Sequence, residues 1–188
     1  MTTTDTKETI MTVARAMVQA RGYNALSFRE LAKEVGIKSA SIHYHFPTKG
    51  DLGAALARRY TEDAIAYFDG LLADSPDQET RIRNYTNVFR AALLKDNRMC
   101  LCGIMAAEYD DLPVDVRTEV DRFTEANVQW LVKVLSLRKS AAETEAVRRQ
   151  ALAVFAAIEG AQLVARGRGD IAVFDQTIEA YRTAGLLP

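Results

Sequence analysis

Apolar residues recur every three or four positions along nearly the whole of the 188-residue chain, a spacing typical of amphipathic helices. The four prolines interrupt no helical pattern, and those at 47, 76 and 113 fall at breaks between patterns. Runs that alternate β-branched residues do not persist, so strands are not expected. The sequence therefore predicts an all-α fold of about nine helices. The expected helices are one ending near residue 22, then 27–35, 39–45, 48–72, 78–96, 98–109, 113–138, 141–166 and 171–185.

Charge is distributed unevenly along the chain. The net charge is −1, yet residues 1–50 hold seven basic and four acidic side chains, which leaves the remainder acidic. A positive N-terminal end favours an anionic partner there. The first ten residues lack the apolar core of a signal peptide, and two cysteines do not make a disulfide framework. We therefore expect a cytoplasmic protein with no membrane span.

The segment "FRELAKEVGIKSASIHYHF" (28–46) joins two short helical patterns through a glycine. Ser27 and Glu30 form a capping pair for the first helix, and Gly36 permits a tight turn between the two. This order of elements is typical of a helix-turn-helix. A second capping pair, Thr48 and Asp51, begins the next helix after a proline.

The second helix of this motif has a surface suited to the major groove of DNA. If Ile42 and Phe46 point inward, the rest of the helix presents small polar groups and one aromatic hydroxyl, which reach base edges and phosphates without blocking entry. Two lysines bracket the helix, and the amides at the start of the next helix can hold a phosphate. The residues in question are Lys38, Ser39, Ser41, Tyr44, His45, Thr48 and Lys49.

Residues 26–52, "LSFRELAKEVGIKSASIHYHFPTKGDL", resemble the DNA-binding signature of the TetR family of transcriptional repressors. The resemblance covers about the first 50 residues, and beyond them only helical pattern and length match. It implies a DNA-binding domain over 1–47 and a ligand-binding and dimerisation domain over 48–188, linked by the helix 48–72. It also implies a homodimer that binds palindromic operator DNA and dissociates from it when a small molecule binds.

Carried onto matching positions, the resemblance assigns roles within the motif. Arg29 would approach a base edge, and Ser39, Ala40 and Ser41 would form the front of the reading helix. Phosphate contacts would come from Ser27, Tyr44, His45 and Lys49. The small front face favours some reading of DNA shape. His43 departs from the family pattern, where a tyrosine is frequent, and its role as packing or groove contact stays open.

Two histidines and two cysteines raise the question of a metal or redox site. His43 and His45 lie about 200° apart on a helix, so they cannot share a metal, and we expect no metal or cofactor. Cys100 and Cys102 are small apolar residues that suit a core. The alternative is a repressor that senses oxidants or electrophiles through one of them, with Arg98 as a source of a lowered thiol pKa.

Several residues in the later helices are candidates for contact with a small-molecule effector. Asn127 interrupts an apolar stripe and needs either an internal hydrogen bond or a ligand. Glu159 is the sole charge in residues 151–165 and requires a cation, a proton or solvent. If Glu159 lines the pocket, it favours a ligand with a donor or positive group. The remaining candidates, equally consistent with core, are Tyr85, Phe89, Met105, Trp130, Phe155 and Gln162.

The helix 141–166 also carries a stripe of small residues: Val147, Ala151, Val154, Ile158, Ala161 and Ala165. Together with the last helix, this stripe suits either a four-helix bundle with a second subunit or the core of the chain itself. Enzyme motifs such as GxSxG, HExxH or a P-loop are missing, so an enzyme is not expected. A helical interaction protein without DNA binding remains the third alternative.

Overall fold

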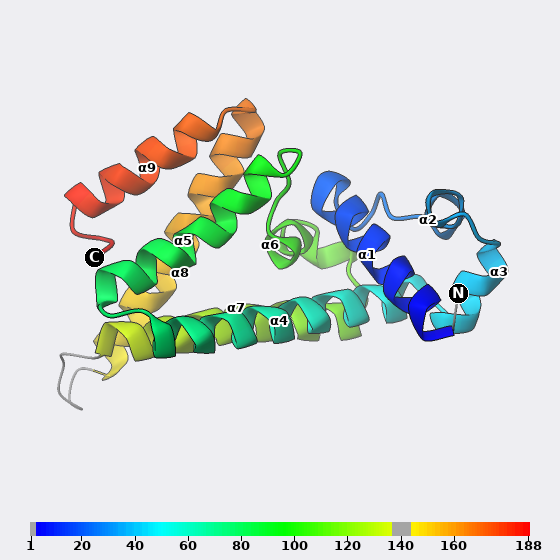
Figure 1. Cartoon of the computed structure of the whole chain (residues 1–188), viewed down its shortest axis with the longest axis horizontal. Helices are drawn as coiled ribbons and strands as arrows, with labels where there is room; N and C mark the ends of the chain where they lie inside the picture. Colours follow the sequence, from blue (N-terminus) through cyan, green and yellow to red (C-terminus); the bar gives the residue numbers. More distant parts are fainter. Residues whose placement is uncertain (1–2, 137–143) are drawn as a thin grey trace. The chain divides into compact units, whose positions relative to one another are not determined.

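The computed structural model describes residues 3–136 and 144–188, and every regular element among them is helical (Figure 1). There are nine α-helices and one short 3₁₀-helix in this part of the chain, in agreement with the predicted all-α fold. The helices 113–138 and 141–166 expected from the sequence would extend into residues 137–143, which lie outside the described ranges. No helix in the described ranges is both long and apolar enough to cross a membrane.

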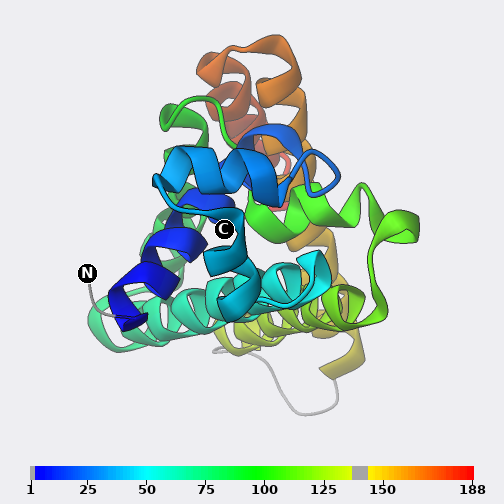
Figure 2. The same ribbon diagram turned by 90° about the vertical axis from the view of Figure 1, so that its right-hand side faces the viewer.

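The chain divides into two compact units, of which the first contains the described residues up to Thr61 together with Leu101–Phe123. It holds α1 (Thr3–Arg21), α2 (Phe28–Val35), α3 (Ser39–His45), the start of α4 (Lys49–Asp74), α6 (Leu101–Ala106), η1 (Tyr109–Asp111) and the start of α7 (Val114–Ser136). Helix α1 packs against both α2 and α6, and α2 packs against α3. Figure 2 shows α2 and α3, in two shades of blue, in front of the other helices of this unit.

The core of the first unit explains the orientation of α3. Ile10, Leu31 and Ile42, from α1, α2 and α3, are fully buried together with Leu52 of α4. Each such side chain contributes roughly 1.5–3 kcal/mol relative to exposure. Since Ile42 and Phe46 are buried, the opposite side of α3 is left for solvent.

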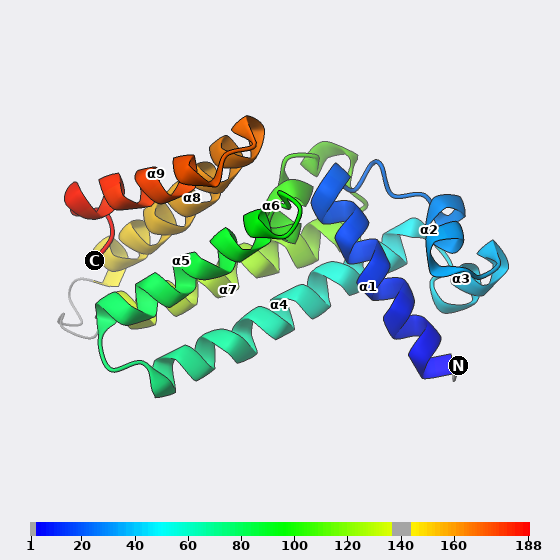
Figure 3. The same ribbon diagram turned by 45° about the horizontal axis from the view of Figure 1, so that its top comes forward.

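The second unit contains Glu62–Cys100 and the described residues from Thr124 to the C-terminus. Its helices are the remainder of α4 and α7, α5 (Gln78–Leu94), α8 (Thr144–Arg168) and α9 (Ile171–Thr183). Helices α5, α8 and α9 pack against one another, as Figure 3 also shows. Trp130 of α7 donates a hydrogen bond of 2.8 Å from Nε1 to the Phe68 carbonyl of α4, which ties these two helices together within the unit.

Two sequence predictions need correction. The helix expected over 98–109 is shorter, because the chain turns at Asp96 and Asn97, both with positive φ, and enters α6 only at Leu101. The small-residue stripe of α8 does not face a second subunit. All six of its residues are at most 2% exposed and pack inside the chain, as the intrachain alternative required.

Candidate functional site

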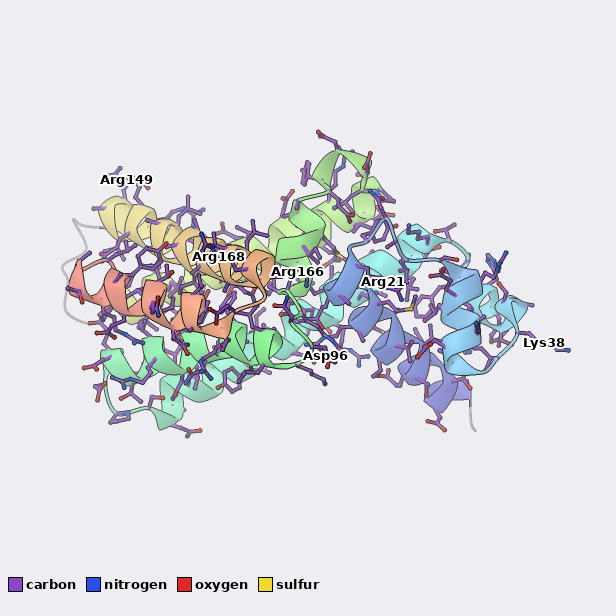
Figure 4. All side chains as sticks on the ribbon, turned by 90° about the horizontal axis from the view of Figure 1, so that it is seen from above. Arg21, Lys38, Asp96, Arg149, Arg166 and Arg168 are labelled. Atoms are coloured by element: carbon purple, nitrogen blue, oxygen red, sulfur yellow. The ribbon has the colours of Figure 1, made fainter. Side chains whose placement is uncertain are left out.

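The predicted DNA-binding residues lie together in the first unit, on α2, α3 and the start of α4. Arg29, Lys38, Ser39, Ala40, Tyr44 and Thr48 are exposed, and Ser27, Ser41, His45 and Lys49 are partly exposed. Tyr44 is 75% exposed, the highest value among the exposed large hydrophobic side chains of the described chain. Lys38 extends into solvent from the turn between α2 and α3 (Figure 4). These side chains therefore form one accessible surface, which we call the α3 face.

Local capping sets the position of the α3 face. The Ser27 hydroxyl accepts a hydrogen bond of 3.4 Å from the Glu30 amide, and Gly36 ends α2 in the left-handed region with φ +78°. A glycine is favoured there because a side chain is strained at positive φ. Both features agree with the predicted helix-turn-helix.

The beginning of α4 is closed by a complete capping pair. The Thr48 amide and hydroxyl both donate to Asp51 Oδ2, at 2.9 and 2.7 Å, and the Asp51 amide donates to the Thr48 hydroxyl at 3.1 Å. A phosphate approaching the Thr48 amide would have to compete with the Asp51 carboxylate.

His43 makes contacts inside the motif. Its ring meets the Phe28 ring edge-to-face, with centroids 4.9 Å apart, and its Nδ1 lies 3.2 Å from the Pro47 carbonyl oxygen. The ring is nevertheless exposed, so His43 packs on its own motif and borders the α3 face. Among the described residues, no group of three or more His, Cys, Asp or Glu could hold a metal ion.

Lys49 does not point freely into solvent. Its Nζ donates a hydrogen bond of 3.1 Å to the Asn24 carbonyl and lies 4.5 Å from the centre of the Tyr23 ring. Burial lowers the pKa of Lys49, and the nearby Glu108 carboxylate opposes that shift. Tyr23, Asn24 and Lys49 line a cleft of about 440 Å³ together with Asp51, Asp111, Asp115 and their neighbours.

The residues that surround Lys49 could not be predicted from the sequence pattern. Glu108 accepts hydrogen bonds from the amides of Tyr23 and Asn24, and the side chain of Asn24 donates to Asp111. These partners are separated by more than 80 positions along the chain. Helical periodicity reports which face of a helix is buried, and it carries no information about such distant polar pairs.

Most of the predicted effector residues are buried in the second unit. Tyr85, Phe89, Asn127, Trp130, Phe155 and Gln162 are each at most 8% exposed. Met105 is fully buried as well, but it belongs to the first unit. The rings of Tyr85 and Trp130 stack with centroids 5.1 Å apart, and both also contact Phe68.

The buried amides in this core already have partners. The Tyr85 hydroxyl donates to Asn127 Oδ1 at 2.9 Å, which is the internal hydrogen bond that the sequence left open. Gln162 accepts from the Cys100 amide at 3.0 Å and donates to the Phe89 carbonyl at 2.8 Å. Both amides are therefore engaged in holding helices together.

Glu159 differs from its neighbours. The residue is partly exposed, yet both carboxylate oxygens are buried and have no hydrogen-bond partner of good geometry among the described residues. Burial raises the pKa of Glu159 to about 7, while the adjacent Cys100 thiol acts to lower it. At neutral pH, protonated and ionised forms are therefore close in population, and a donor placed beside the carboxylate would select the ionised form.

Both cysteine thiols are buried, Cys100 in the second unit and Cys102 in the first. Arg98, expected to lower a thiol pKa, instead pairs with Asp96 at 2.8 Å. Thiols buried in a protein core are generally inert towards oxidants.

Comparison with known proteins agrees with the geometry of the α3 face. Residues 10–56 match the family model described as bacterial regulatory proteins, tetR family. No curated protein matches the chain.

Solved structures extend the likeness to the whole chain. A TetR transcriptional regulator from Legionella pneumophila is 32% identical with a TM-score of 0.88, over 95% of this chain and 96% of that one. A TetR-family regulator from Agrobacterium tumefaciens is 29% identical with a TM-score of 0.84, over 94% and 95%. The regulator FadR from Bacillus subtilis, solved in complex with stearoyl-CoA, shares the fold alone, at 13% identity and a TM-score of 0.65 over 92% and 95%. With whole-chain identity at this level and a matching helix-turn-helix, the protein belongs to the TetR family and is a DNA-binding transcriptional regulator, not an enzyme.

Proposed function

We propose that the protein is a homodimeric repressor that binds a palindromic operator through its α3 face and releases it when a small molecule binds. The observation that carries this proposal is the α3 face itself, where polar and basic side chains are exposed while Ile42 and Phe46 are buried. In this proposal residues 1–47 form the DNA-binding domain, residues 48–188 bind the effector and the second subunit, and the protein acts in the cytoplasm.

Contacts to DNA divide into two classes. Arg29 and the small residues Ser39, Ala40 and Ser41 would lie against base edges, where the low profile of α3 lets the helix approach the groove floor. Ser27, Lys38, Tyr44, His45, Thr48 and Lys49 would hold phosphates, which set register and affinity without reading sequence.

The homodimer is supported by an apolar surface on α8 opposite its buried stripe. Leu152, Leu163 and Val164 are 50%, 57% and 53% exposed, and Ala156 and Gly160 between them are exposed as well. An exposed apolar stripe on a helix is typical of an interface between subunits. We call these five residues the α8 outer stripe.

The effector proposal rests on the buried carboxyl of Glu159. Ligand pockets are mainly apolar with a few polar groups, and the aromatic residues around Tyr85 and Trp130 supply the apolar part. A buried carboxylate favours a ligand that brings a donor or a positive charge. FadR shows that a protein of this fold can accommodate an acyl-CoA. Burial of both thiols gives the thiol-sensing alternative no support.

The DNA-binding role of the α3 face is tested with two tyrosine variants. Tyr44→Ala should weaken binding to the preferred duplex of the wild-type protein by about tenfold or more, because the proposed phosphate contact is lost. Tyr67→Ala removes a comparable ring, 49% exposed on α4, and should leave affinity unchanged. Fluorescence anisotropy with a labelled duplex measures both. Equal affinities for wild type and Tyr44→Ala would remove the α3 face from the binding site.

A further inference from the structure

The loop between α1 and α2 is held by a carboxylate that lies far away in sequence. Glu108 Oε2 accepts hydrogen bonds from the Tyr23 amide at 2.6 Å and the Asn24 amide at 3.1 Å. A second carboxylate, Asp111, accepts from the Asn24 side chain at 2.9 Å. Hydrogen bonds to a charged acceptor are roughly twice as strong as neutral ones, so this loop is fastened to the segment that follows α6.

The backbone at Gly22 is shaped around the same carboxylate. Its φ is +90°, and a β-carbon placed there would lie only 2.6 Å from Glu108 Oε1. Any side chain at this position would have to displace the carboxylate. The Glu108 carboxylate therefore occupies the space that a side chain at position 22 would fill.

The third member of this arrangement is Lys49, the first residue of α4. Its ammonium group donates to the Asn24 carbonyl and lies over the Tyr23 ring, on the two residues whose amides Glu108 binds. The Glu108 carboxylate also acts electrostatically to keep Lys49 charged. The ammonium is thereby drawn towards the loop, although it belongs to the residue proposed to contact a DNA phosphate.

We propose that Glu108 is a positioning residue for DNA binding, which holds the Lys49 ammonium on the α1–α2 loop so that the loop and a DNA phosphate compete for it. We call Glu108, Tyr23, Asn24 and Lys49 the loop clamp. The inference rests on the proposed phosphate contact of Lys49. Glu108 follows the end of α6 by two residues.

A double-mutant cycle on Glu108 and Lys49 tests the clamp. Glu108→Gln keeps an oxygen that can accept from the loop amides but removes the charge, and Lys49→Met removes the ammonium while keeping the stem. The probe is the duplex that the wild-type protein enriches from a random library, titrated over a salt series. Glu108→Gln should raise affinity about three- to tenfold with Lys49 present and have no effect with Met at 49. Lys49→Met alone should lower the salt slope by about one.

Two controls separate the clamp from simpler effects. Asp115→Asn removes an exposed negative charge from the same cleft without touching the loop, and should change affinity much less than Glu108→Gln. Thermal unfolding confirms that each variant folds.

Every other result overturns the inference. If Glu108→Gln also raises DNA affinity when residue 49 is Met, or if Asp115→Asn raises affinity equally, the gain would come from the loss of a negative charge near DNA and not from the clamp. A loss of affinity in Glu108→Gln would mean that the carboxylate only aligns the reading helix, and no change would mean that the clamp does not act on DNA binding. An unchanged salt slope in Lys49→Met would instead remove the phosphate contact, while a wild type that enriches no duplex would refute the operator-binding proposal itself.

Discussion

At the scale of single residues, the buried carboxyl of Glu159 makes the stability of the protein depend on pH. Both of its oxygens are buried without a hydrogen-bond partner of good geometry, and burial raises its pKa from 4.5 to about 7. Between pH 4.5 and about 7, the Glu159 carboxyl therefore keeps its proton in the folded chain and loses it in the unfolded chain. Stability from this group is complete below pH 4.5 and is lost as pH rises towards 7.

The variant Glu159→Gln should remove this pH dependence, because glutamine resembles the protonated acid. The difference in unfolding free energy between the variant and the wild type should grow by roughly 3 kcal/mol in favour of the variant as pH rises from about 4.5 to 8. This figure follows from about 1.4 kcal/mol for each unit by which the pKa is raised. Urea unfolding at fixed protein concentration across this range measures the difference.

Glu125→Gln is the matched control for that series. Glu125 is hydrogen-bonded by Arg148, which lowers the pKa of this carboxyl below its usual 4.5, so the control should be flat over the same range. A Glu159→Gln curve that runs parallel to wild type would show that the carboxyl is solvated or paired in solution.

Residues whose structural role depends on neighbours in sequence could be predicted from the sequence. The capping pairs at Ser27 and Thr48 and the glycine at 36 were predictable because their partners lie within four positions. Glu108 was not, because its partners Tyr23 and Asn24 are 85 and 84 positions away. Glu159 stood out in the sequence as a lone charge, but only the structure shows that its oxygens are buried and lie beside the Cys100 thiol.

At the scale of elements, the α1–α2 loop joins local conformation to tertiary contact. Gly22→Ala should destabilise the protein by about 1–3 kcal/mol, because alanine is strained at positive φ and its β-carbon would meet Glu108. Gly70→Ala is the control, since nothing lies within 4 Å of a β-carbon in that helical position. It should be neutral or stabilising by up to about 1 kcal/mol. Differential scanning calorimetry compares the two, and similar melting temperatures would contradict the packing described for Gly22.

Element boundaries followed the sequence where local signals set them. Helix α3 spans the residues expected, because a glycine turn precedes it and a proline follows it. The short α6 was overestimated, because the turn at Asp96 and Asn97 depends on tertiary contacts. Asn97 and Arg166 exchange hydrogen bonds of 3.1 and 2.7 Å through their side chains and carbonyls. The turn residue Asp96 and the α8 residue Arg166 can be found in Figure 4.

For the molecule as a whole, α8 shows why periodicity alone could not decide between a core of the chain and an interface between subunits. Two of its faces are apolar, and the pattern cannot tell which one the chain itself covers. The small-residue stripe lies inside, while the α8 outer stripe is left exposed. We therefore propose that two subunits join through the α8 outer stripe.

The double variant Leu152→Glu/Leu163→Glu should convert the proposed dimer into a monomer, because two charges on each subunit would have to be buried at the proposed interface. Sedimentation should then give a mass near 20.8 kDa instead of twice that value. Leu94→Glu alters a leucine that is 62% exposed on α5 and should remain dimeric. If the double variant still sediments as a dimer, another surface joins the subunits.

In the proposed function, a dimer reads an inverted repeat through two copies of the α3 face. The most direct measurement is selection of duplexes from a random library by the wild-type protein, followed by sedimentation of the enriched complex. We predict an inverted repeat whose half-sites are about one helical turn, or a small multiple of it, apart, bound by an even number of chains. An enriched pool without a repeat, or one chain bound to a single half-site, would show that the protein does not read DNA as a dimer.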